Sequence, residues 1–506
     1  MLLQDIVDNA AATLPERPAL VHGQTRWTFA ELAQRVHTLA QRIRELTEPA
    51  GRVAVLSSNT AAYVAALYAV PAAGRVLVHC NTRHTAQEVT ATIERSGAEL
   101  LLGSEDELDR LAHVPAPTLR HRMVLDNEVL DNEVPVNSPT AHSEDSTPTG
   151  AEDDTAWLMY TSGTTGTPKG VMLTHRSLIA AVLNTTMGRP VSEDEVYLYP
   201  FPLFHIAAYN VLHLHMRRRP VVLLGSFEPQ AVLDAIADEA VTSVSLAPTM
   251  LAMLLDHPTR DDSRLVSLRT VTYGAAAMPL ELLRRSLAEW PDVGLAQGYG
   301  MTELSGNAVF LSPADHRLAA TTRPDLLSAA GRPGPLVRLR IESDAGTGAA
   351  PGEPGEILVR GDQVCAGYLD DPDESARSIT DGWLHTGDIG RMDADGYLHV
   401  VDRLKDIIIT GGENVSSREV EDVLSLHPDV ESVAVVGTPD ERWGELVTAV
   451  VVPRPGRAPS LESLRAACGT LAGFKHPRRV VVVEDLPTNA SGKLDKVAVR
   501  KLARQP

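Results

Sequence analysis

Short apolar runs alternate with longer amphipathic stretches along the chain up to about Gly331. Three such runs, with the pattern of strands buried on both faces, are residues 52–56, 76–78 and 100–102. Residues 61–73 read as an apolar helix, and residues 29–46 have apolar positions at helical spacing. Thr28, with Glu31 three residues later, fits a capping box at the start of that helix. The alternation predicts an α/β fold with parallel, doubly wound sheets.

The pattern changes after Gly331, where short apolar runs are separated by turn residues. These runs, which predict a small antiparallel or barrel-like sheet, are residues 336–341, 355–360 and 396–400. The last hundred residues or so mix strands and helices and have the length of one small domain. We therefore expect a large N-terminal domain over residues 1–402 and a small, mobile α+β domain over residues 403–506. A stretch rich in Ser, Thr, Pro and acidic residues, 137–154, is expected to be an exposed connection.

The composition describes an ordinary globular protein. The 506 residues are 43% hydrophobic and 22% charged, which allows more than one domain with large cores. A net charge of −20 argues against non-specific nucleic-acid binding, so any polyanionic ligand needs a local cluster of donors. Three widely spaced cysteines form no disulfide framework, and the N-terminus lacks a signal pattern. No apolar run approaches about 18 residues, so we expect a cytoplasmic protein without a membrane span.

A loop of hydroxyls, glycines and one lysine lies between apolar runs at residues 156–159 and 171–173. Its residues are Tyr160, Thr161, Ser162, Gly163, Thr164, Thr165, Gly166, Thr167, Pro168, Lys169 and Gly170. Glycines let backbone N–H groups turn toward one point, and the hydroxyls and the ammonium add donors, so the loop suits a polyphosphate. It is not a Walker loop, because Pro168 replaces the second glycine and Gly170 follows Lys169 where Ser or Thr is required.

This loop closely resembles the phosphate loop of the adenylate-forming (ANL) superfamily, the AMP-dependent synthetases and ligases. That superfamily includes acyl-CoA synthetases, the adenylation domains of peptide synthetases, and luciferases. The resemblance spans essentially the whole chain, with further motifs in the family's order, and it implies an enzyme that binds ATP and Mg²⁺. The nucleotide contacts that it implies are Thr161, Ser162, Gly163, Thr164, Thr165, Lys169, Gly274, Ala275, Ala276, Gln297, Gly298, Tyr299, Gly300, Thr302, Asp388 and Arg403.

Residues 297–303 read Gln-Gly-Tyr-Gly-Met-Thr-Glu and resemble the superfamily's second nucleotide motif. By that resemblance Tyr299 lies along the adenine, Thr302 contacts the α-phosphate and Glu303 binds Mg²⁺. A carboxylate suits Mg²⁺, which takes oxygen ligands and few protein groups. Residues 274–276, Gly-Ala-Ala, resemble the strand-end segment whose backbone flanks the adenine and the acyl pocket.

Residues 383–388 resemble the ribose motif of the superfamily. This resemblance implies that Asp388 accepts hydrogen bonds from the ribose hydroxyls. Arg403 follows 15 residues later and would be the second ribose contact. Lys405 matches the position about which the C-terminal domain rotates in this superfamily. Without the resemblance, Asp388 would be read as a turn residue and Lys405 as an exposed lysine.

Residues 487–493 resemble the superfamily's C-terminal motif, which contains the catalytic lysine. By that resemblance Lys493 would bridge the substrate carboxylate and the α-phosphate. Gly411 and Gly412 resemble the segment that lines the pantetheine tunnel of CoA after domain rotation. A turn before a helix would have the same two glycines, and both interpretations can hold. The basic cluster at residues 474–479 either lies near the CoA phosphates or forms a solvated face.

His205 resembles the residue that guards the acyl pocket and lies near the substrate carboxylate. The other pocket residues, which are small, apolar or neutral, are expected at 206–210, 245–248, 273–277 and 305–308. None of these residues is an Arg or Lys that could pair with a second carboxylate. A medium-length aliphatic or an aromatic monoacid is therefore favoured over a malonate-like diacid.

We expect an AMP-forming acyl-CoA synthetase that converts a carboxylic acid to an acyl-adenylate, releases pyrophosphate and transfers the acyl group to CoA. Two alternatives remain: loading of a separate carrier-protein pantetheine, or activation of another oxyanion such as nitrite for attack by an amine, as in a diazotase. A non-catalytic nucleotide-binding scaffold is disfavoured because Lys493, Glu303 and Asp388 are all present. The sequence leaves open whether the chain is a monomer or a homodimer.

Overall fold

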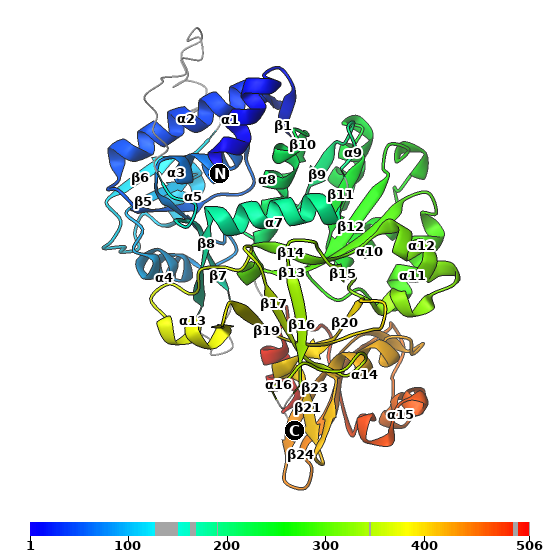
Figure 1. Ribbon diagram of the computed structural model, residues 1–506. Coiled ribbons are helices and arrows are strands. Elements are labelled where there is room, and N and C mark those ends of the chain that lie inside the picture. Colours follow the sequence, from blue (N-terminus) through cyan, green and yellow to red (C-terminus); the bar gives the residue numbers. More distant parts are fainter. Residues whose placement is uncertain (127–149, 162–167, 190, 344–345, 489–493, 505–506) are drawn as a thin grey trace.

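The computed structural model describes residues 1–126, 150–161, 168–189, 191–343, 346–488 and 494–504. Three sheets form a large part, and the fourth sheet lies in a smaller part at the C-terminal end of the chain (Figure 1). The expected connection at residues 137–154 lies mostly outside the described residues. Among the described residues, no helix combines the length and apolar character that a membrane crossing requires.

The six-stranded sheet has the order β6-β5-β3-β4-β7-β8, parallel except for the antiparallel pair β7–β8. Its strands are β3 (Arg52–Leu56), β4 (Val76–His79), β5 (Leu100–Gly103), β6 (His121–Val124), β7 (Thr155–Thr161) and β8 (Lys169–Thr174). The helices of this part of the chain are α1 (Gln4–Thr13), α2 (Phe29–Leu46), α3 (Ala61–Ala72), α4 (Ala86–Ser96) and α5 (Glu105–Arg110), of which α2 also contacts β1 and β2 of the nine-stranded sheet. Helix α3 is buried on every side, which its uniformly apolar sequence permits. The predicted Thr28–Glu31 capping box at the start of α2 is confirmed.

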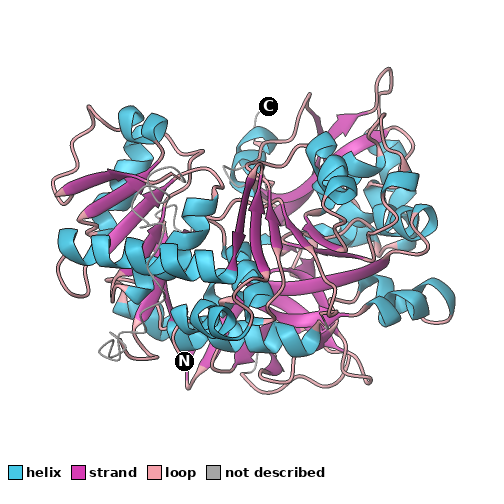
Figure 2. Ribbon diagram, turned by 90° about the horizontal axis from the view of Figure 1, so that it is seen from above, coloured by secondary structure: helices cyan, strands magenta, loops and turns pink. Residues whose placement is uncertain are grey.

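The nine-stranded sheet has the order β15-β14-β13-β12-β11-β9-β10-β1-β2 and is parallel from β13 to β1. Its strands are β1 (Pro18–His22), β2 (Thr25–Thr28), β9 (Tyr197–Tyr199), β10 (Val221–Leu223), β11 (Ser243–Leu246), β12 (Thr270–Gly274), β13 (Gly294–Met301), β14 (Gly306–Leu311) and β15 (Arg332–Pro333). The helices that follow its strands are α8 (Tyr209–Met216), α9 (Pro229–Asp238), α10 (Pro248–Leu255), α11 (Leu280–Glu289) and α12 (Pro313–Thr321), and α7 (His175–Gly188) precedes β9. Figure 2 shows the strands of the molecule in separate groups with helices between and around them.

One apolar core joins the two large sheets. Trp157 of β7 and Tyr197 of β9 are both fully buried in it, although they belong to different sheets. Helix α7 begins directly after β8 of the first sheet and packs against β14 of the second. The end of α7 is thereby fixed beside the nine-stranded sheet (Figure 1).

The third sheet is antiparallel and leads into the small part. It contains β16 (Arg338–Glu342), β17 (Gly355–Arg360), β18 (Ile379–Thr380), β19 (Trp383–Met392) and β20 (Leu398–Arg403), with α13 (Pro372–Ser378) beside it. The small part contains β21 (Ile408–Thr410), β22 (Glu413–Val415), β23 (Val430–Asp440), β24 (Gly444–Pro453), β25 (Arg479–Val482), α14 (Ser417–Leu424), α15 (Leu461–Ala467) and α16 (Lys496–Ala503). It has its own apolar core, around residues such as Val420, Val435 and Val447.

Short 3-10 helices connect several of these elements. They are η1 (Ile206–Ala208), η2 (Asp262–Arg264), η3 (Thr302–Leu304), η4 (Pro324–Ser328), η5 (Leu404–Asp406), η6 (Cys468–Thr470) and η7 (Gly473–Lys475). The predicted α/β fold, with a large N-terminal and a small C-terminal part, is confirmed. Helix α16 was missed because its apolar stripe is narrow: only Val499 and Ala503 are buried.

Candidate active site

The predicted nucleotide residues gather where two parallel strands of the nine-stranded sheet end. Strand β12 ends at Gly274, which lies opposite Gly298 of β13. Gln297 lies within β13, and Thr302 begins η3 directly after it. The carboxyl ends of neighbouring parallel strands form the usual ligand crevice of α/β sheets. Strand β8 reaches this crevice from the six-stranded sheet, where it contacts η3.

The β7–β8 hairpin presents the ends of the predicted phosphate loop, with Thr161 opposite Lys169. Four predicted contacts lie outside the described residues: Ser162, Gly163, Thr164 and Thr165. The Lys169 ammonium forms an ion pair with Glu374 of α13 and lies 5.5 Å from the centre of the Tyr368 ring. Lys169 is therefore held at the end of the hairpin by a carboxylate and an aromatic face.

Glu303 is a buried carboxylate in η3, and only 8% of it is exposed. Its Oε1 accepts a hydrogen bond of 3.3 Å from the Tyr368 hydroxyl. Burial raises the pKa of Glu303, and no cation among the described residues forms an ion pair with it. A buried carboxylate without a cationic partner fits a bound metal ion, so Glu303 suits Mg²⁺. Because Tyr368 lies between Glu303 and Lys169, the predicted metal ligand and the predicted phosphate contact belong to one site.

Asp388 connects the second nucleotide motif to the ribose motif. It stands opposite Arg403 in the β19–β20 register, with its Oδ1 2.6 Å from Arg403 Nε. The Tyr299 hydroxyl donates to Asp388 Oδ2 at 2.7 Å. Burial raises the pKa of Asp388, and Arg403 and Tyr299 oppose that rise. The residues predicted to contact adenine and ribose are thus brought together from strands that are far apart in sequence.

The strand ends carry the small residues that a close ligand requires. Ala275 has a φ of +65°, a left-handed conformation that is strained for a residue with a Cβ and is typical of functional sites. Ala275 and Ala276 are exposed at the end of β12. At Gly300 an added Cβ would lie 2.0 Å from the carbonyl oxygen of Gly306, so only glycine fits there.

His205 lies directly before η1, where its ring packs edge-to-face on Phe204 with centroids 4.7 Å apart. Burial lowers the pKa of the neighbouring His79 to about 3, and the charge of His205 contributes to that shift. Tyr209, one turn after His205, packs against Gly306, where an added Cβ would lie 2.9 Å from its ring. Tyr209 therefore brings the start of α8, four residues after His205, against the segment after Glu303 that was expected to line the acyl pocket.

The predicted CoA residues lie in the small part of the molecule. Gly411 and Gly412 form the two-residue turn of the β21–β22 hairpin, with φ values of 61° and 86°. Both are exposed, and the Gly411 N–H donates to the Trp443 carbonyl oxygen at 2.8 Å. Lys493 lies outside the described residues, so its catalytic role stays a prediction.

Sequence reasoning missed two residues that contact the predicted phosphate and metal residues, Tyr368 and Glu374. Glu374 lies 205 residues after Lys169, its ion-pair partner. The local sequence gives only a helix-start signal, because the Asp371 side chain accepts from the Glu374 N–H at the first turn of α13. The start of helix α13 was therefore predictable from the local sequence, but the ion pair between Glu374 and Lys169 was not.

Comparison with known proteins identifies the family. Residues 7–369 match the family of AMP-binding enzymes, and residues 419–493 match the AMP-binding enzyme C-terminal domain. The chain is 40% identical over 493 residues to a feruloyl-CoA synthase from an Amycolatopsis species, with 96% of each chain covered. It is 36% identical over 520 residues to a methyl-dioxo-octahydroindenyl-propanoyl:CoA ligase from Mycobacterium tuberculosis, with 98% of each chain covered.

Two solved structures share the fold over nearly the whole length. One is o-succinylbenzoate-CoA synthetase from Bacillus subtilis in complex with its acyl-adenylate intermediate. It has a TM-score of 0.85 and 31% identity, covering 99% of this chain and 98% of that one. The other is an amide bond synthetase from Marinactinospora thermotolerans, with a TM-score of 0.87, 33% identity and 99% of each chain covered.

The expectation derived from the phosphate loop is confirmed by these matches. Relatives named as CoA ligases align with the whole chain, and one solved neighbour contains ATP and a magnesium ion. The enzyme is an ATP-dependent acyl-CoA synthetase of the AMP-forming kind, and it uses Mg²⁺ and CoA. The chain belongs to the family of AMP-binding enzymes within the adenylate-forming superfamily.

Proposed function

We propose that this acyl-CoA synthetase activates a carboxylic acid with a compact, ring-bearing tail, aromatic or alicyclic. The observation that supports this proposal is a cavity of about 290 Å³ beside the nucleotide crevice. It lies between the end of α7, strands β12 to β14 and the start of α12. Two relatives are named for a feruloyl group and for an octahydroindenyl propanoyl group, which also favours a ring-bearing acid.

The first step joins the acid to AMP. A carboxylate oxygen forms a bond to the α-phosphorus of ATP, and the bond from that phosphorus to the bridging oxygen breaks, which releases pyrophosphate. Lys169 would hold the departing phosphates, and Lys493 would place its ammonium between the carboxylate and the α-phosphate, where negative charge increases. Glu303 would hold Mg²⁺, which when bound neutralises charge on the triphosphate.

The nucleoside would be held by the residues around the end of β13. Tyr299 would lie along the adenine, and the backbone of residues 274–276 would flank it. Asp388 would accept from the ribose hydroxyls, with Arg403 keeping its carboxylate in place at 2.6 Å. Thr302 would donate to the α-phosphate and keep it in line with the attacking oxygen.

The second step transfers the acyl group to CoA. The thiol sulfur forms a bond to the acyl carbonyl carbon, the bond from that carbon to the AMP oxygen breaks, and the thiol proton leaves to solvent. Gly411 and Gly412 would face the pantetheine arm after the small domain turns, and His205 would border the acyl carbonyl. We place the domain boundary after residue 402 and the hinge at Lys405, which is exposed in η5.

Lys493→Ala provides the test of the proposed roles. We expect pyrophosphate release from ATP and acid to fall about a hundredfold or more, because a cation beside the developing charge is lost. Transfer from a supplied acyl-adenylate to CoA should stay within a few-fold of the wild type. Lys501→Ala, an exposed lysine of α16, is the control and should leave both steps unchanged. Equal loss of both steps in Lys493→Ala would contradict the assignment.

The same assay identifies the acid and the acceptor. A panel of arylpropenoates, bicyclic propanoates and medium-length fatty acids is compared by pyrophosphate release, with CoA, a carrier-protein pantetheine or an amine as acceptor. The carrier and amine arms are included because one relative is named as a fatty acid–acyl-carrier-protein ligase and one solved neighbour is an amide bond synthetase. Faster turnover with a straight-chain fatty acid than with every ring-bearing acid would overturn the proposed substrate class.

A further inference from the structure

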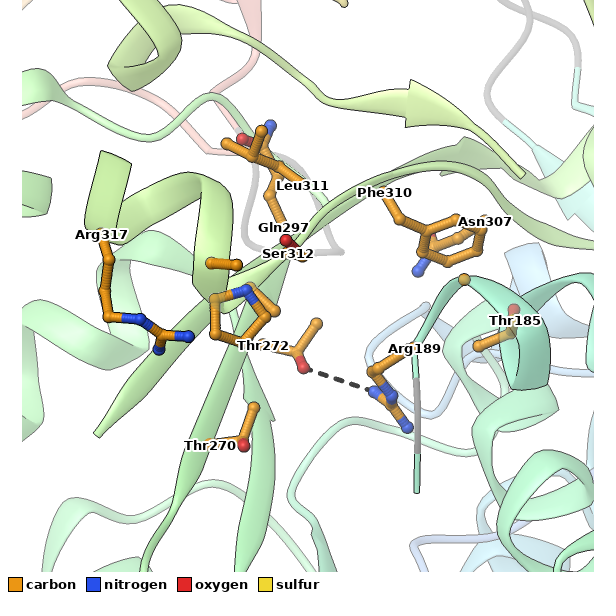
Figure 3. Close-up of a pocket in the computed structure, with 14 residues that line it drawn as sticks. Thr185, Arg189, Thr270, Thr272, Gln297, Asn307, Phe310, Leu311, Ser312 and Arg317 are labelled. Carbon is orange, nitrogen blue, oxygen red and sulfur yellow. Dashed lines mark hydrogen bonds between the residues drawn. The ribbon is translucent and has the colours of Figure 1, made fainter. Parts of the chain in front are cut away.

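The cavity beside the nucleotide crevice has mainly apolar walls, and two arginines, Arg189 and Arg317, border it. Its lining residues are Thr185, Gly188, Arg189, Thr270, Thr272, Ala296, Gln297, Asn307, Phe310, Leu311, Ser312, Pro313, Ala314 and Arg317. Figure 3 shows Arg189 and Arg317 on opposite sides of it. Arg317 is exposed on α12, whereas Arg189 is only partly exposed and reaches the strands of the sheet.

In the part of the chain that the structure describes, Arg189 is held by neutral groups. Its Nη1 lies 3.4 Å from Thr272 Oγ1, its Nη2 donates to His213 Nδ1 at 3.1 Å, and its guanidinium lies 5.5 Å from the centre of the Tyr197 ring. Burial is the main cause that lowers the pKa of His213 well below its usual value, and the charge of Arg189 adds to it, so His213 is neutral. Within the described ranges, no carboxylate comes within ion-pairing distance of Arg189.

An arginine beside a cavity is costly unless something accepts its hydrogen bonds. A guanidinium has five N–H donors and stays charged in proteins. His213, which accepts one of them, is fully buried, and its Nε2 has no hydrogen-bond partner in the described part of the chain. Arg189 is therefore an uncompensated positive charge at the wall of a cavity, the environment in which an acceptor oxygen of a ligand binds strongly.

The position of Arg189 fits the far end of the acid. Thr272 lies two residues before Gly274, the strand end where the nucleotide motif begins. At about 3.3 Å per residue, Thr272 lies about 7 Å along β12 from Gly274, and Thr270 lies about 13 Å from it. Asn307 lies between the two regions, since an added Cβ at Gly298 would be 2.2 Å from its side-chain nitrogen. A tail that enters from the strand ends therefore passes Asn307 before it reaches Arg189.

We propose that Arg189 is a specificity-determining residue that binds a carbonyl or carboxylate oxygen at the end of the acid remote from the reacting carboxylate. This inference rests on the proposed function, because it assigns the cavity to the tail of the acid. It also revises the expectation of a pocket without Arg or Lys, since Arg189 enters from the end of α7 and not from the segments expected to line the pocket.

The test compares three para-substituted cinnamates of similar shape. The substituents are acetyl, carboxylate and isopropyl, so that the first two present an oxygen and the third does not. For the wild type we expect kcat/KM for pyrophosphate release to be about tenfold or more higher with the preferred oxygen-bearing acid than with the isopropyl acid. Preference for both acetyl and carboxylate identifies a general oxygen acceptor, and preference for carboxylate alone identifies a diacid substrate.

Arg189→Met should remove this preference while retaining turnover of the isopropyl acid, and Arg189→Lys should restore part of it. Arg284→Met, at an exposed arginine of α11 that does not line the cavity, is the matched control and should keep the wild-type preference. Calorimetric binding of the three acids checks that the effect lies in recognition. Equal turnover of the three acids by the wild type, or a preference that persists in Arg189→Met, would overturn the role of Arg189. Absence of pyrophosphate release with every acid tried would instead overturn the proposed function as a whole.

Discussion

At the scale of single residues, the predicted nucleotide crevice contains charged side chains that differ in what balances their charge. Lys169 pairs with Glu374, and Asp388 pairs with Arg403. Among the described residues, Glu303 accepts a side-chain hydrogen bond only from the neutral Tyr368 hydroxyl, and burial raises its pKa. The pKa of Glu374 is lowered, first by its hydrogen bond from Lys169 and then by Arg377. The Glu303 carboxylate is thus free to bind a metal ion in the proposed mechanism, whereas the Glu374 carboxylate holds the Lys169 ammonium.

The ion pair of Lys169 predicts how stability depends on pH. Because the pKa of Glu374 is lower in the folded protein than its usual 4.5, the pair stabilises the fold above that pH. This stabilisation is lost as the pH falls through the lowered value. Glu374→Gln should therefore reduce the free energy of unfolding by about 1 kcal/mol at pH near 7, and the difference from the wild type should disappear in acid. Unfolding curves of both proteins across this pH range check the prediction.

Arg377→Gln is the control for this effect. Arg377 also pairs with Glu374, but 67% of its side chain is exposed, against 14% for Lys169. Exposed ion pairs contribute little to stability, so this variant should unfold almost like the wild type. A loss in Glu374→Gln that is equally large at acid and neutral pH would show that the ion pair is not its cause.

At the scale of elements, many of the predicted site residues lie at strand ends and in hairpin turns. Hydrogen bonds between neighbouring strands fix the backbone conformation there. The β7–β8 hairpin places Lys169 opposite Thr161, and the β19–β20 register places Asp388 opposite Arg403. The β21–β22 turn requires a positive φ at both central residues, which glycine supplies without strain. The positions of Lys169, Asp388 and Arg403 are therefore determined by the pairing of neighbouring strands.

The same substitution should affect stability differently at the two glycines of the β21–β22 turn. Gly411→Ala and Gly412→Ala both place a Cβ at a positive φ, which is unfavourable. Only at Gly411 does the new Cβ also meet the Trp443 ring, at 2.9 Å, whereas space at Gly412 is open. Gly411→Ala should therefore be less stable than Gly412→Ala by about 1 kcal/mol or more, because the ring must move. Thermal unfolding of the two variants measures the difference, and equal melting temperatures would contradict it.

At the scale of the whole molecule, a short segment around η5 joins the large part to the small part, which has an apolar core of its own. Asp402, at the end of β20, accepts hydrogen bonds from Ser417 Oγ at 2.8 Å and from Ser416 Oγ at 3.2 Å. These bonds tie the start of α14 in the small part to the large part. Beside them Lys405 is exposed, and Arg500 of α16 donates to its carbonyl oxygen at 3.0 Å.

Loss of the Asp402 contact should expose the segment around η5. Ser417→Ala removes a hydrogen bond to a buried carboxylate, so local opening of this segment should become about tenfold more frequent. Trypsin should then cut after Lys405 faster than in the wild type, as measured by mass spectrometry over time. Ser425→Ala is the control, because Ser425 is exposed and bonds only within α14 and its end. An unchanged rate of cleavage at Lys405 would show that Asp402 does not restrain this segment.

Much of the fold could be predicted from local sequence. The Thr28–Glu31 capping box and the apolar character of residues 61–73 depend on neighbours within one or two helical turns, so both predictions are confirmed with small changes at the ends. The alternation of buried strands and helices likewise predicted parallel sheets. The narrow apolar stripe of α16 was too weak a local signal to identify it as a helix.

The sequence predicts the candidate site as a set of motifs, but it does not predict the contacts between them. The sequence determined the chemistry of the phosphate loop and of the Tyr299–Glu303 segment, because glycines, hydroxyls and a carboxylate at fixed spacing limit what a loop can bind. Only the tertiary structure decided that Glu374 holds Lys169 across 205 residues and that Arg189 meets Thr272 across 83 residues. Local sequence sets the conformation and chemistry of each segment, whereas contacts between distant side chains depend on strand register and helix packing, which form only when the whole chain folds.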